Sequence, residues 1–231
     1  MKFETNITDV FSRTYNVKSF RFPKCQLFNY SPGQFMFITI KSGEKKLKKH
    51  FTISTSPTED FLEFTKKLTG HDFSNALDKL KKGDWIEIDG PYGNFTFRGE
   101  FPKIGMLTGG IGITPLRSMI KYCTDIKNKS QIVLLYSNRF KKDVIFKDEF
   151  EDLQEQNSNL KIVLTLSSQK NNWKGYSRRI DKEMIFREIP DLKERIFFTC
   201  GPPGLVTGME KLLQELDIDE KNIRKEKFPG Y

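Results

Sequence analysis

A glycine-rich stretch in the middle of the chain has residue types and spacing that suit a phosphate-binding turn. Residues 106–120 read MLTGGIGITPLRSMI, with three glycines in four positions between an apolar run and an apolar-faced helical pattern. One glycine suffices for a tight turn, so three indicate that a ligand approaches the backbone closely. Thr114 is a good N-cap and Pro115 has no N–H to lose, which predicts a helix start here. Gly110 and Gly112 would leave backbone N–H groups free at a positive helix end, where a diphosphate binds well.

A second candidate site lies near the end of the chain. The apolar run RIFFT (195–199) leads into CGPPGLV (200–206), so Cys200 would end a strand directly before a helix. In open α/β sheets, ligands bind along the edge formed by the carboxyl ends of the strands. Each stretch also has a structural explanation. A lone cysteine is commonly a small buried residue, and Pro115 stands where the usual dinucleotide fingerprint has its third glycine, so a simple strand-to-helix turn stays open.

Two kinds of sequence surround these stretches. Up to about residue 100, short β-like runs alternate with turn signals, and a helical pattern interrupts them at DFSNALDKL, which predicts an antiparallel barrel or sandwich. The expected strands are residues 3–11, 15–22, 34–40, 51–55, 61–67 and 85–88.

After residue 100, apolar runs alternate with helical patterns, which predicts a parallel sheet covered by helices. The expected strands are 104–108, 131–136, 160–166 and 195–199, and the expected helices are 115–127, 144–156, 181–189 and 203–216.

Three motifs in this order resemble the ferredoxin–NADP reductase superfamily of flavoprotein reductases: GGIGITP, LLYSNR (134–139) and CGPPGLV, all after a β-rich domain. The resemblance covers nearly the whole chain. It implies an antiparallel Greek-key β-barrel that binds FAD, expected over residues 1–100. It also implies a Rossmann-like α/β domain with a parallel sheet that binds NADPH or NADH, expected over residues 101–231.

The resemblance also implies roles for residues of the barrel. The family motif R-x-[YF]-[ST] corresponds to Lys49-His50-Phe51-Thr52. Lys49 replaces the arginine that pairs with the flavin diphosphate, so the charge is kept but the bidentate fork is lost. Phe51 would stack on the isoalloxazine ring, and Thr52 would place a hydroxyl near N5, where the hydride arrives. The expected flavin contacts further include His50, Thr65, Lys66, Gly70, Ser74 and Asn75.

In the second domain, Cys200 would lie near the nicotinamide carbon that gives up the hydride, and Glu226 would adjust the charge there. Glu226 precedes an aromatic residue by two positions, as in the family, but the chain continues to Tyr231, so either Phe228 or Tyr231 could cover the flavin. No acidic residue stands at 137–139, and Arg139 could pair with a 2′-phosphate, which slightly favours NADPH. The expected nucleotide contacts are Gly110, Gly112, Thr114, Ser137, Asn138, Arg139, Cys200, Gly201 and Pro202.

Composition limits the chemistry. Three scattered cysteines exclude a four-cysteine iron–sulfur cluster on this chain, and two histidines exclude a histidine-rich metal site, so no metal is expected. Electrons would therefore leave to another molecule, such as an acidic ferredoxin, a flavodoxin or an oxygenase component. The formal net charge is +9, with lysines at 45, 46, 48 and 49 before the flavin motif. These lysines form either a solvated surface or a docking face for that acidic partner.

No nucleic-acid motif accompanies the charge, and we expect no membrane span and no signal peptide, hence a cytoplasmic reductase. Two alternatives stay open. One is a flavin- and nucleotide-binding electron-transfer subunit of a larger complex without turnover of its own, and the other is a reductase that uses flavin as a free substrate.

Overall fold

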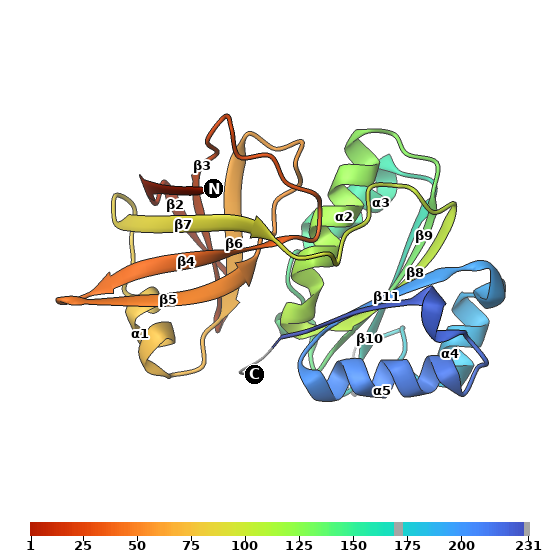
Figure 1. Ribbon diagram of the computed structural model, residues 1–231. Coiled ribbons are helices and arrows are strands. Elements are labelled where there is room, and N and C mark those ends of the chain that lie inside the picture. Colours follow the sequence, from red (N-terminus) through yellow and green to blue (C-terminus); the bar gives the residue numbers. More distant parts are fainter. Residues whose placement is uncertain (169–172, 229–231) are drawn as a thin grey trace.

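The computed structural model describes residues 1–168 and 173–228. Its two halves lie side by side, with β-strands alone on one side, apart from one short helix, and a helix-covered sheet on the other (Figure 1). The described helices include none that is long and apolar enough to cross a membrane.

The N-terminal half consists of two antiparallel sheets, with strand orders β1-β7-β4-β5 and β2-β3-β6. Side chains alternate between the inner and outer faces, so Met36, Ile38 and Ile40 of one strand are all fully buried. The elements are β1 (Lys2–Asn6), β2 (Asp9–Thr14), β3 (Val17–Pro23), β4 (Phe35–Ser42), β5 (Lys45–Thr52), β6 (Phe61–Lys67), α1 (Asp72–Asp78) and β7 (Trp85–Tyr92).

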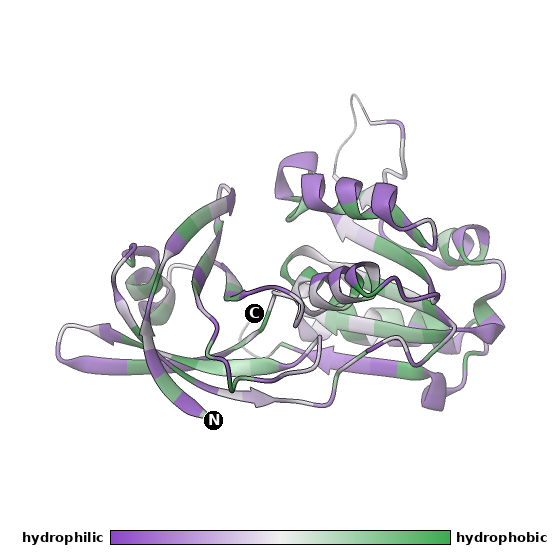
Figure 2. Ribbon diagram, turned by 90° about the horizontal axis from the view of Figure 1, so that it is seen from above, coloured by the Kyte–Doolittle hydropathy of each residue, from purple (hydrophilic) through white to green (hydrophobic). Residues whose placement is uncertain are grey.

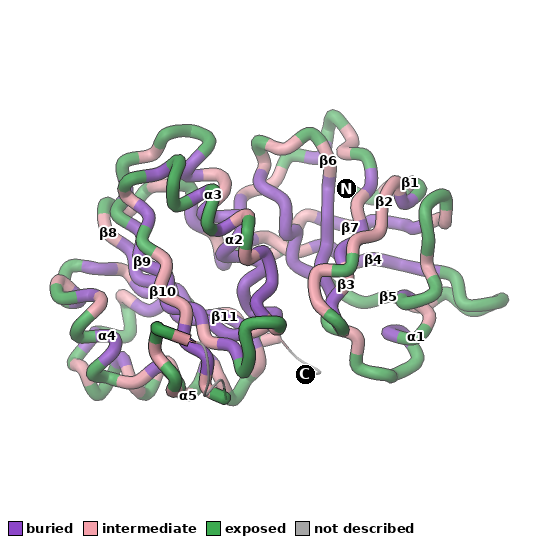
Figure 3. Tube along the Cα trace, turned by 180° about the vertical axis from the view of Figure 1, so that it is seen from behind, coloured by how far each residue is buried: buried purple, intermediate pink, exposed green. Residues whose placement is uncertain are grey.

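The C-terminal half is a five-stranded parallel sheet of order β10-β9-β8-β11-β12. Helices α2 and α3 cover one face and α4 and α5 the other, and the strands between them are hydrophobic and buried (Figures 1, 2 and 3). The strands are β8 (Lys103–Gly109), β9 (Gln131–Asn138), β10 (Leu160–Leu166), β11 (Ile196–Gly201) and β12 (Ile223–Lys227), and the helices are α2 (Ile113–Asp125), α3 (Lys147–Gln156), α4 (Lys182–Glu188) and α5 (Pro203–Gln214).

The predicted fold class is therefore confirmed, and the strand order adds the position of the site. The chain runs from β8 outwards to β9 and β10, then returns to β11 on the other side of β8. A crevice opens at the carboxyl ends of two strands where the order reverses in this way. Residues 109–112 and Cys200 lie at that point, at the ends of β8 and β11.

Four sequence expectations differ from the structure in detail. The strand expected over residues 51–55 is instead β5, which ends at Thr52. The run 3–11 forms two strands. The N–H of Ile7 donates to the carbonyl of Asp84, directly before β7, whereas the N–H of Thr8 donates to the carbonyl of Arg21 of β3, in the other sheet. Strand β12 was missed, because its sequence IRKEK carries the charges of an edge strand rather than an apolar pattern. Helix α2 begins at Ile113, and Thr114 donates its hydroxyl to the carbonyl of Ile111 instead of capping the helix.

A buried ion network joins the two halves. Arg117 of α2 is 5% exposed and donates to the carbonyl of Ser54 at 3.0 Å and to the Glu59 carboxylate. The same guanidinium pairs with Glu149 of α3. Because Ser54 follows the strand that ends at Thr52, this network fixes the helix behind the glycine turn against the predicted flavin motif. The predicted boundary near residue 100 lies in the segment between β7 and β8 and stays a prediction.

Candidate functional site

Two cavities open where the halves meet. The first, here called the barrel cavity, has a volume of about 320 Å³. The second, the sheet-edge cavity, has a volume of about 690 Å³. Ile111, in the short turn η1 (Gly110–Gly112), lines both. The barrel cavity is lined by Phe35, Lys49, His50, Phe51, Thr52, Thr65, Lys66, Ile111, Thr114, Glu226, Lys227 and Phe228.

Aromatic side chains form one wall of the barrel cavity. Phe51 is 7% exposed, and its ring stacks on that of Phe64 with centroids 5.0 Å apart. Phe73 of α1 packs against the same ring. Phe51 is therefore held rigidly by the barrel core while it also borders the cavity, as a planar ligand requires. Thr52, the next residue, lines the cavity as well.

Positive charge gathers in the barrel cavity as well. Lys49 of β5 and Lys66 of β6 both line it. The pKa of Lys66 is lowered to about 8, first because the ammonium is buried and then because Lys49 and Lys67 repel it. A buried cation beside a second cation suits an anionic ligand, so this set fits the diphosphate of a flavin dinucleotide.

Glu226 borders the same cavity from β12. It lies opposite Cys200 in the register of β11 and β12. Burial raises the pKa of Glu226 to about 7, so near neutral pH the carboxyl group can both hold and release a proton. The chain is fixed just beyond, where the backbone N–H of Phe228 donates to the carbonyl of Gly201 at 2.9 Å.

The glycine turn forms the floor of the sheet-edge cavity. Gly110 has a φ of +53°, and a Cβ added there would meet no atom within 4 Å, so the space above it is open. The buried Tyr136 holds this turn, because its hydroxyl donates to the carbonyl of Gly110 at 3.1 Å and accepts from the N–H of Ile145 at 3.2 Å. A fixed turn with open backbone suits the close approach of a phosphate.

Cys200 and Gly112 have a different role from Gly110. Cys200 is fully buried, and its thiol donates to the carbonyl of Gly112 at 3.0 Å. A Cβ on Gly112 would lie 2.3 Å from the Cys200 carbonyl oxygen, so only glycine fits where the two strand ends meet. Burial raises the pKa of the Cys200 thiol well above its usual value, so the thiol keeps its proton near neutral pH, and its position beside a nicotinamide stays a prediction. It lines neither cavity.

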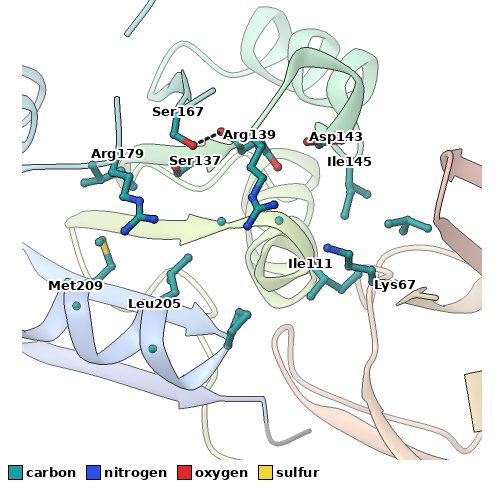
Figure 4. Close-up of a pocket in the computed structure, with 18 of the residues that line it drawn as sticks. Lys67, Ile111, Ser137, Arg139, Asp143, Ile145, Ser167, Arg179, Leu205 and Met209 are labelled. Carbon is teal, nitrogen blue, oxygen red and sulfur yellow. Dashed lines mark hydrogen bonds between the residues drawn. The ribbon is translucent and has the colours of Figure 1, made fainter. Parts of the chain in front are cut away.

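Cationic side chains surround the sheet-edge cavity. Arg139 and Arg179 reach over its floor, and Lys67 enters from the barrel side (Figure 4). Among its lining residues, Asp143 is the one carboxylate, and it accepts a hydrogen bond from the N–H of Phe140. This excess of positive over negative side chains favours a ligand with several negative charges.

The structure brings most of the predicted residues to these two cavities. The sheet-edge cavity takes Gly110, Ser137, Asn138, Arg139 and Pro202. The barrel cavity takes the predicted Lys49, His50, Phe51, Thr52, Thr65, Lys66, Thr114, Glu226 and Phe228.

Six predicted residues lie elsewhere in the described structure, and a seventh lies outside it. Cys200, Gly112 and Gly201 lie behind the turn. Gly70, Ser74 and Asn75 close the loop before α1 on itself, since Thr69 N–H donates to Ser74 and Asn75 donates to the Gly70 carbonyl. They line neither cavity, and their contact with flavin phosphates stays a prediction. Tyr231 lies outside the described residues.

Sequence reasoning missed other lining residues. Lys67 and Arg179 carry charge into the sheet-edge cavity, and Phe35 and Ile111 add apolar surface to the barrel cavity. Arg179 belongs to no motif, so no local signal could have identified it. In the described ranges, no group of three or more His, Cys, Asp or Glu side chains could hold a metal ion.

Both halves of the chain match known protein families. Residues 5–97 match the family model described as Oxidoreductase FAD-binding domain, and residues 106–211 match Oxidoreductase NAD-binding domain. The chain thus carries an FAD-binding and a nicotinamide-nucleotide-binding domain in the predicted order.

Among curated proteins, a glycine betaine monooxygenase reductase subunit of Pseudomonas aeruginosa is 32% identical over 228 residues, which are 95% of this chain. This chain spans 62% of the length of that relative. An NADH-cytochrome b5 reductase 1 of Dictyostelium discoideum is 27% identical over 94% of this chain and 79% of its own length.

Among solved structures, the ferredoxin NADP+ reductase from Neisseria gonorrhoeae with bound FAD and NADP superposes with a TM-score of 0.84. It shares 20% sequence identity and covers 98% of both chains, so the likeness is one of fold. Together with the two family models, which match most of the sequence in the order found here, these relatives show that the chain belongs to the ferredoxin–NADP reductase superfamily of flavoprotein oxidoreductases.

Proposed function

We propose that this protein is an NAD(P)H-dependent reductase that takes a hydride onto FAD in the barrel cavity and passes electrons singly to a separate acceptor. The observation that carries the proposal is the shared wall at Ile111, because a ligand in each cavity would meet the other there. A flavin accepts two electrons as a hydride and can release them one at a time. The protein must then position the two ligands rather than supply a nucleophile.

The residues of the barrel cavity would divide this work. Phe51 supports the plane of the flavin ring, and the Thr52 hydroxyl offers a hydrogen bond at the edge where the hydride arrives. Glu226, with a pKa of about 7, holds or releases a proton near the same edge. Cys200 positions the glycine turn through its bond to the Gly112 carbonyl.

We propose NADPH as the preferred nucleotide. Arg139 and Arg179 line the same cavity and lie close to each other there (Figure 4). Among the described residues, neither arginine forms an ion pair with a carboxylate. A 2′-phosphate would place two negative charges between guanidinium groups, which bind phosphate well. The Dictyostelium relative is named for NADH, so the choice of nucleotide needs measurement.

We propose an acidic carrier protein or an oxygenase component as the acceptor. The Pseudomonas relative is named as the reductase subunit of a monooxygenase. Lys45, Lys46, Lys48 and Lys49 are exposed on β5, an edge strand. The turn of the β4–β5 hairpin points away from the α/β domain (Figure 1). Lys45 pairs with Ser42 beside that turn, while Lys49 borders the barrel cavity. Such a row would steer an acidic partner towards the flavin.

A reducing compartment such as the cytoplasm fits this proposal, because Cys25, Cys123 and Cys200 are all free thiols.

The visible spectrum of the purified protein tests the proposed function. We expect a yellow protein that retains flavin through gel filtration and releases FAD on denaturation. A colourless protein that gains no bound flavin when FAD is supplied would contradict the proposal. Flavin that exchanges freely during turnover would favour the free-flavin reductase, and bound flavin that NADPH and NADH both fail to reduce would favour a subunit without turnover.

A further inference from the structure

The sheet-edge cavity has one wall that comes from the barrel half. Tyr15, Asn16 and Val17 line it together with residues of the α/β half. Tyr15 and Asn16 form the turn of the β2–β3 hairpin, since β2 ends at Thr14 and β3 begins at Val17. The nucleotide contacts expected from the sequence all lie in the α/β half. The hairpin is therefore a part of the cavity that the nucleotide motifs do not explain.

Contacts on several sides fix this hairpin against the α/β half. Val17 is 3% exposed and packs in the hydrophobic core of the α/β half rather than in that of the barrel. The Arg13 guanidinium lies 4.9 Å from the ring centre of Phe146. The carbonyl of Asn16 accepts a hydrogen bond from the N–H of Leu68 at 2.7 Å. The turn is thus held in place without a ligand, which lowers the entropy cost of binding there.

An exposed aromatic ring stands at the tip of this hairpin. Tyr15 is 74% exposed, and Phe140 of the α/β half is exposed as well. The Lys142 ammonium lies 5.3 Å from the ring centre of Tyr15 and 5.8 Å from that of Phe140. Single exposed aromatic residues are ordinary. Two exposed rings from different halves beside one cation instead suit a planar ligand that carries phosphate.

The position of Tyr15 indicates which part of a nucleotide it would contact. The nicotinamide must reach Ile111, where the two cavities meet. Tyr15 lies beside Lys142, in the segment that follows Arg139, and Arg139 is the residue proposed for the 2′-phosphate of the adenosine. The planar group at that end of the nucleotide is adenine.

We propose that Tyr15 of the barrel hairpin stacks on the adenine of the nicotinamide nucleotide, so that the adenosine is bound between the two halves. The inference rests on the proposed function, since it assumes that this nucleotide occupies the sheet-edge cavity. It adds that a residue of the flavin domain contributes to the affinity for the nucleotide. An aromatic side chain suits this role because every base has a flat face on which a ring can stack.

Calorimetric binding of ADP-ribose to the purified full-length protein tests this proposal. ADP-ribose carries the adenosine and the diphosphate but no nicotinamide, so no hydride is transferred during the measurement. For Tyr15→Ala we expect the dissociation constant to rise roughly tenfold, about 1.4 kcal/mol, because the stacking surface is lost. Tyr15→Phe keeps the ring and should stay within about twofold of the parent.

Two controls separate stacking from a general loss of structure. Phe186→Ala removes another exposed ring, one that lines neither cavity, and should leave the affinity for ADP-ribose unchanged. In flavin reduction by NADPH, Tyr15→Ala should raise KM roughly tenfold while kcat stays within about twofold, because the nicotinamide end is untouched. A fall in kcat as large as the rise in KM would contradict the inference. Thermal unfolding of each variant checks that it folds.

The outcomes distinguish this inference from the proposed function. If Tyr15→Ala folds and binds ADP-ribose as the parent does, the hairpin inference is wrong while the reductase proposal stands. If Tyr15→Phe is weakened as much as Tyr15→Ala, the hydroxyl rather than the ring binds, and stacking is also wrong. If Tyr15→Ala alone weakens ADP-ribose but neither NADPH nor NADH reduces the flavin, the reductase proposal fails and the hairpin inference stands. If the parent binds neither ADP-ribose nor NADPH, both fail.

Discussion

The two cavities are built in different ways. The floor of the sheet-edge cavity is backbone, formed by a glycine turn between β8 and α2. The barrel cavity is formed mainly by side chains from β5, β6 and β12, which are far apart in the sequence. At Gly112 the backbone leaves no room for an added Cβ, whereas a side-chain site can exchange one group for another. Lys49 in place of the family arginine is such an exchange.

The largest expected effect concerns the ion network of Arg117, which joins the two halves of the molecule. Arg117→Met should lower the free energy of unfolding by about 3 kcal/mol, because Glu59 and Glu149 lose the cation that compensates their partial burial. Urea unfolding measures this. Lys121→Met on the same helix removes only a more exposed pair with Asp125 and should cost about 0.5 kcal/mol or less. Equal effects of the two changes would show that the network does not hold the halves together.

The next effect tests the backbone site. Gly112→Ala should lower the free energy of unfolding by about 2 kcal/mol, because its Cβ would lie 2.3 Å from the Cys200 carbonyl oxygen and the strand ends must separate. Gly208→Ala in α5 is the matched control, since its Cβ meets nothing within 4 Å and alanine favours a helix. In urea unfolding, Gly112→Ala should be less stable than the parent and Gly208→Ala more stable. A neutral Gly112→Ala would mean that the turn is not close-packed.

The difference between the regions explains what the sequence could predict. The repeated glycines, Gly110 and Gly112, predict a backbone site, because a tight turn alone needs only one glycine. The parallel sheet follows from continuous apolar runs such as residues 131–136. Arg179 could not be predicted, because only the folding of the chain brings it to the sheet-edge cavity.

The burial of individual side chains could not be predicted from the sequence either. Nothing local distinguishes Lys66, buried in the barrel, from the exposed Lys67 beside it, because β6 is buried continuously from Leu62 to Lys66 and only the fold determines where that burial ends. Cys200 was placed correctly at a strand end, but it lines neither cavity, and its thiol bonds to the carbonyl of Gly112, which lies almost ninety positions earlier.

The third effect concerns the side chains of the sheet-edge cavity and their part in the choice of nucleotide. Arg139→Ala should lower the preference for NADPH over NADH about tenfold, roughly 1.4 kcal/mol, because the 2′-phosphate would lose one guanidinium. Steady-state kcat/KM values for both nucleotides measure this, and Arg179→Ala should act in the same direction. An unchanged ratio in both variants would show that neither arginine binds the 2′-phosphate.

The smallest expected effect concerns the barrel cavity and pH. Glu226 has a folded-state pKa of about 7 against an ordinary value of 4.5, so the folded state binds the extra proton between these values. Stability should therefore fall as pH rises through that window and remain lower above it. Glu226→Gln should remove this part of the pH dependence, on the order of 1 kcal/mol, in urea unfolding at acidic and alkaline pH. Parallel pH profiles for parent and variant would contradict the assignment.

The most direct test of the central claim is anaerobic addition of NADPH to the FAD-loaded protein. The two cavities share Ile111, so nucleotide in one should reduce flavin in the other. We expect the flavin absorbance to bleach with one NADPH consumed per flavin, and readmitted acceptor to restore it. Flavin that stays oxidised while NADPH and NADH are both shown to bind would contradict the claim that the cavities serve one reaction.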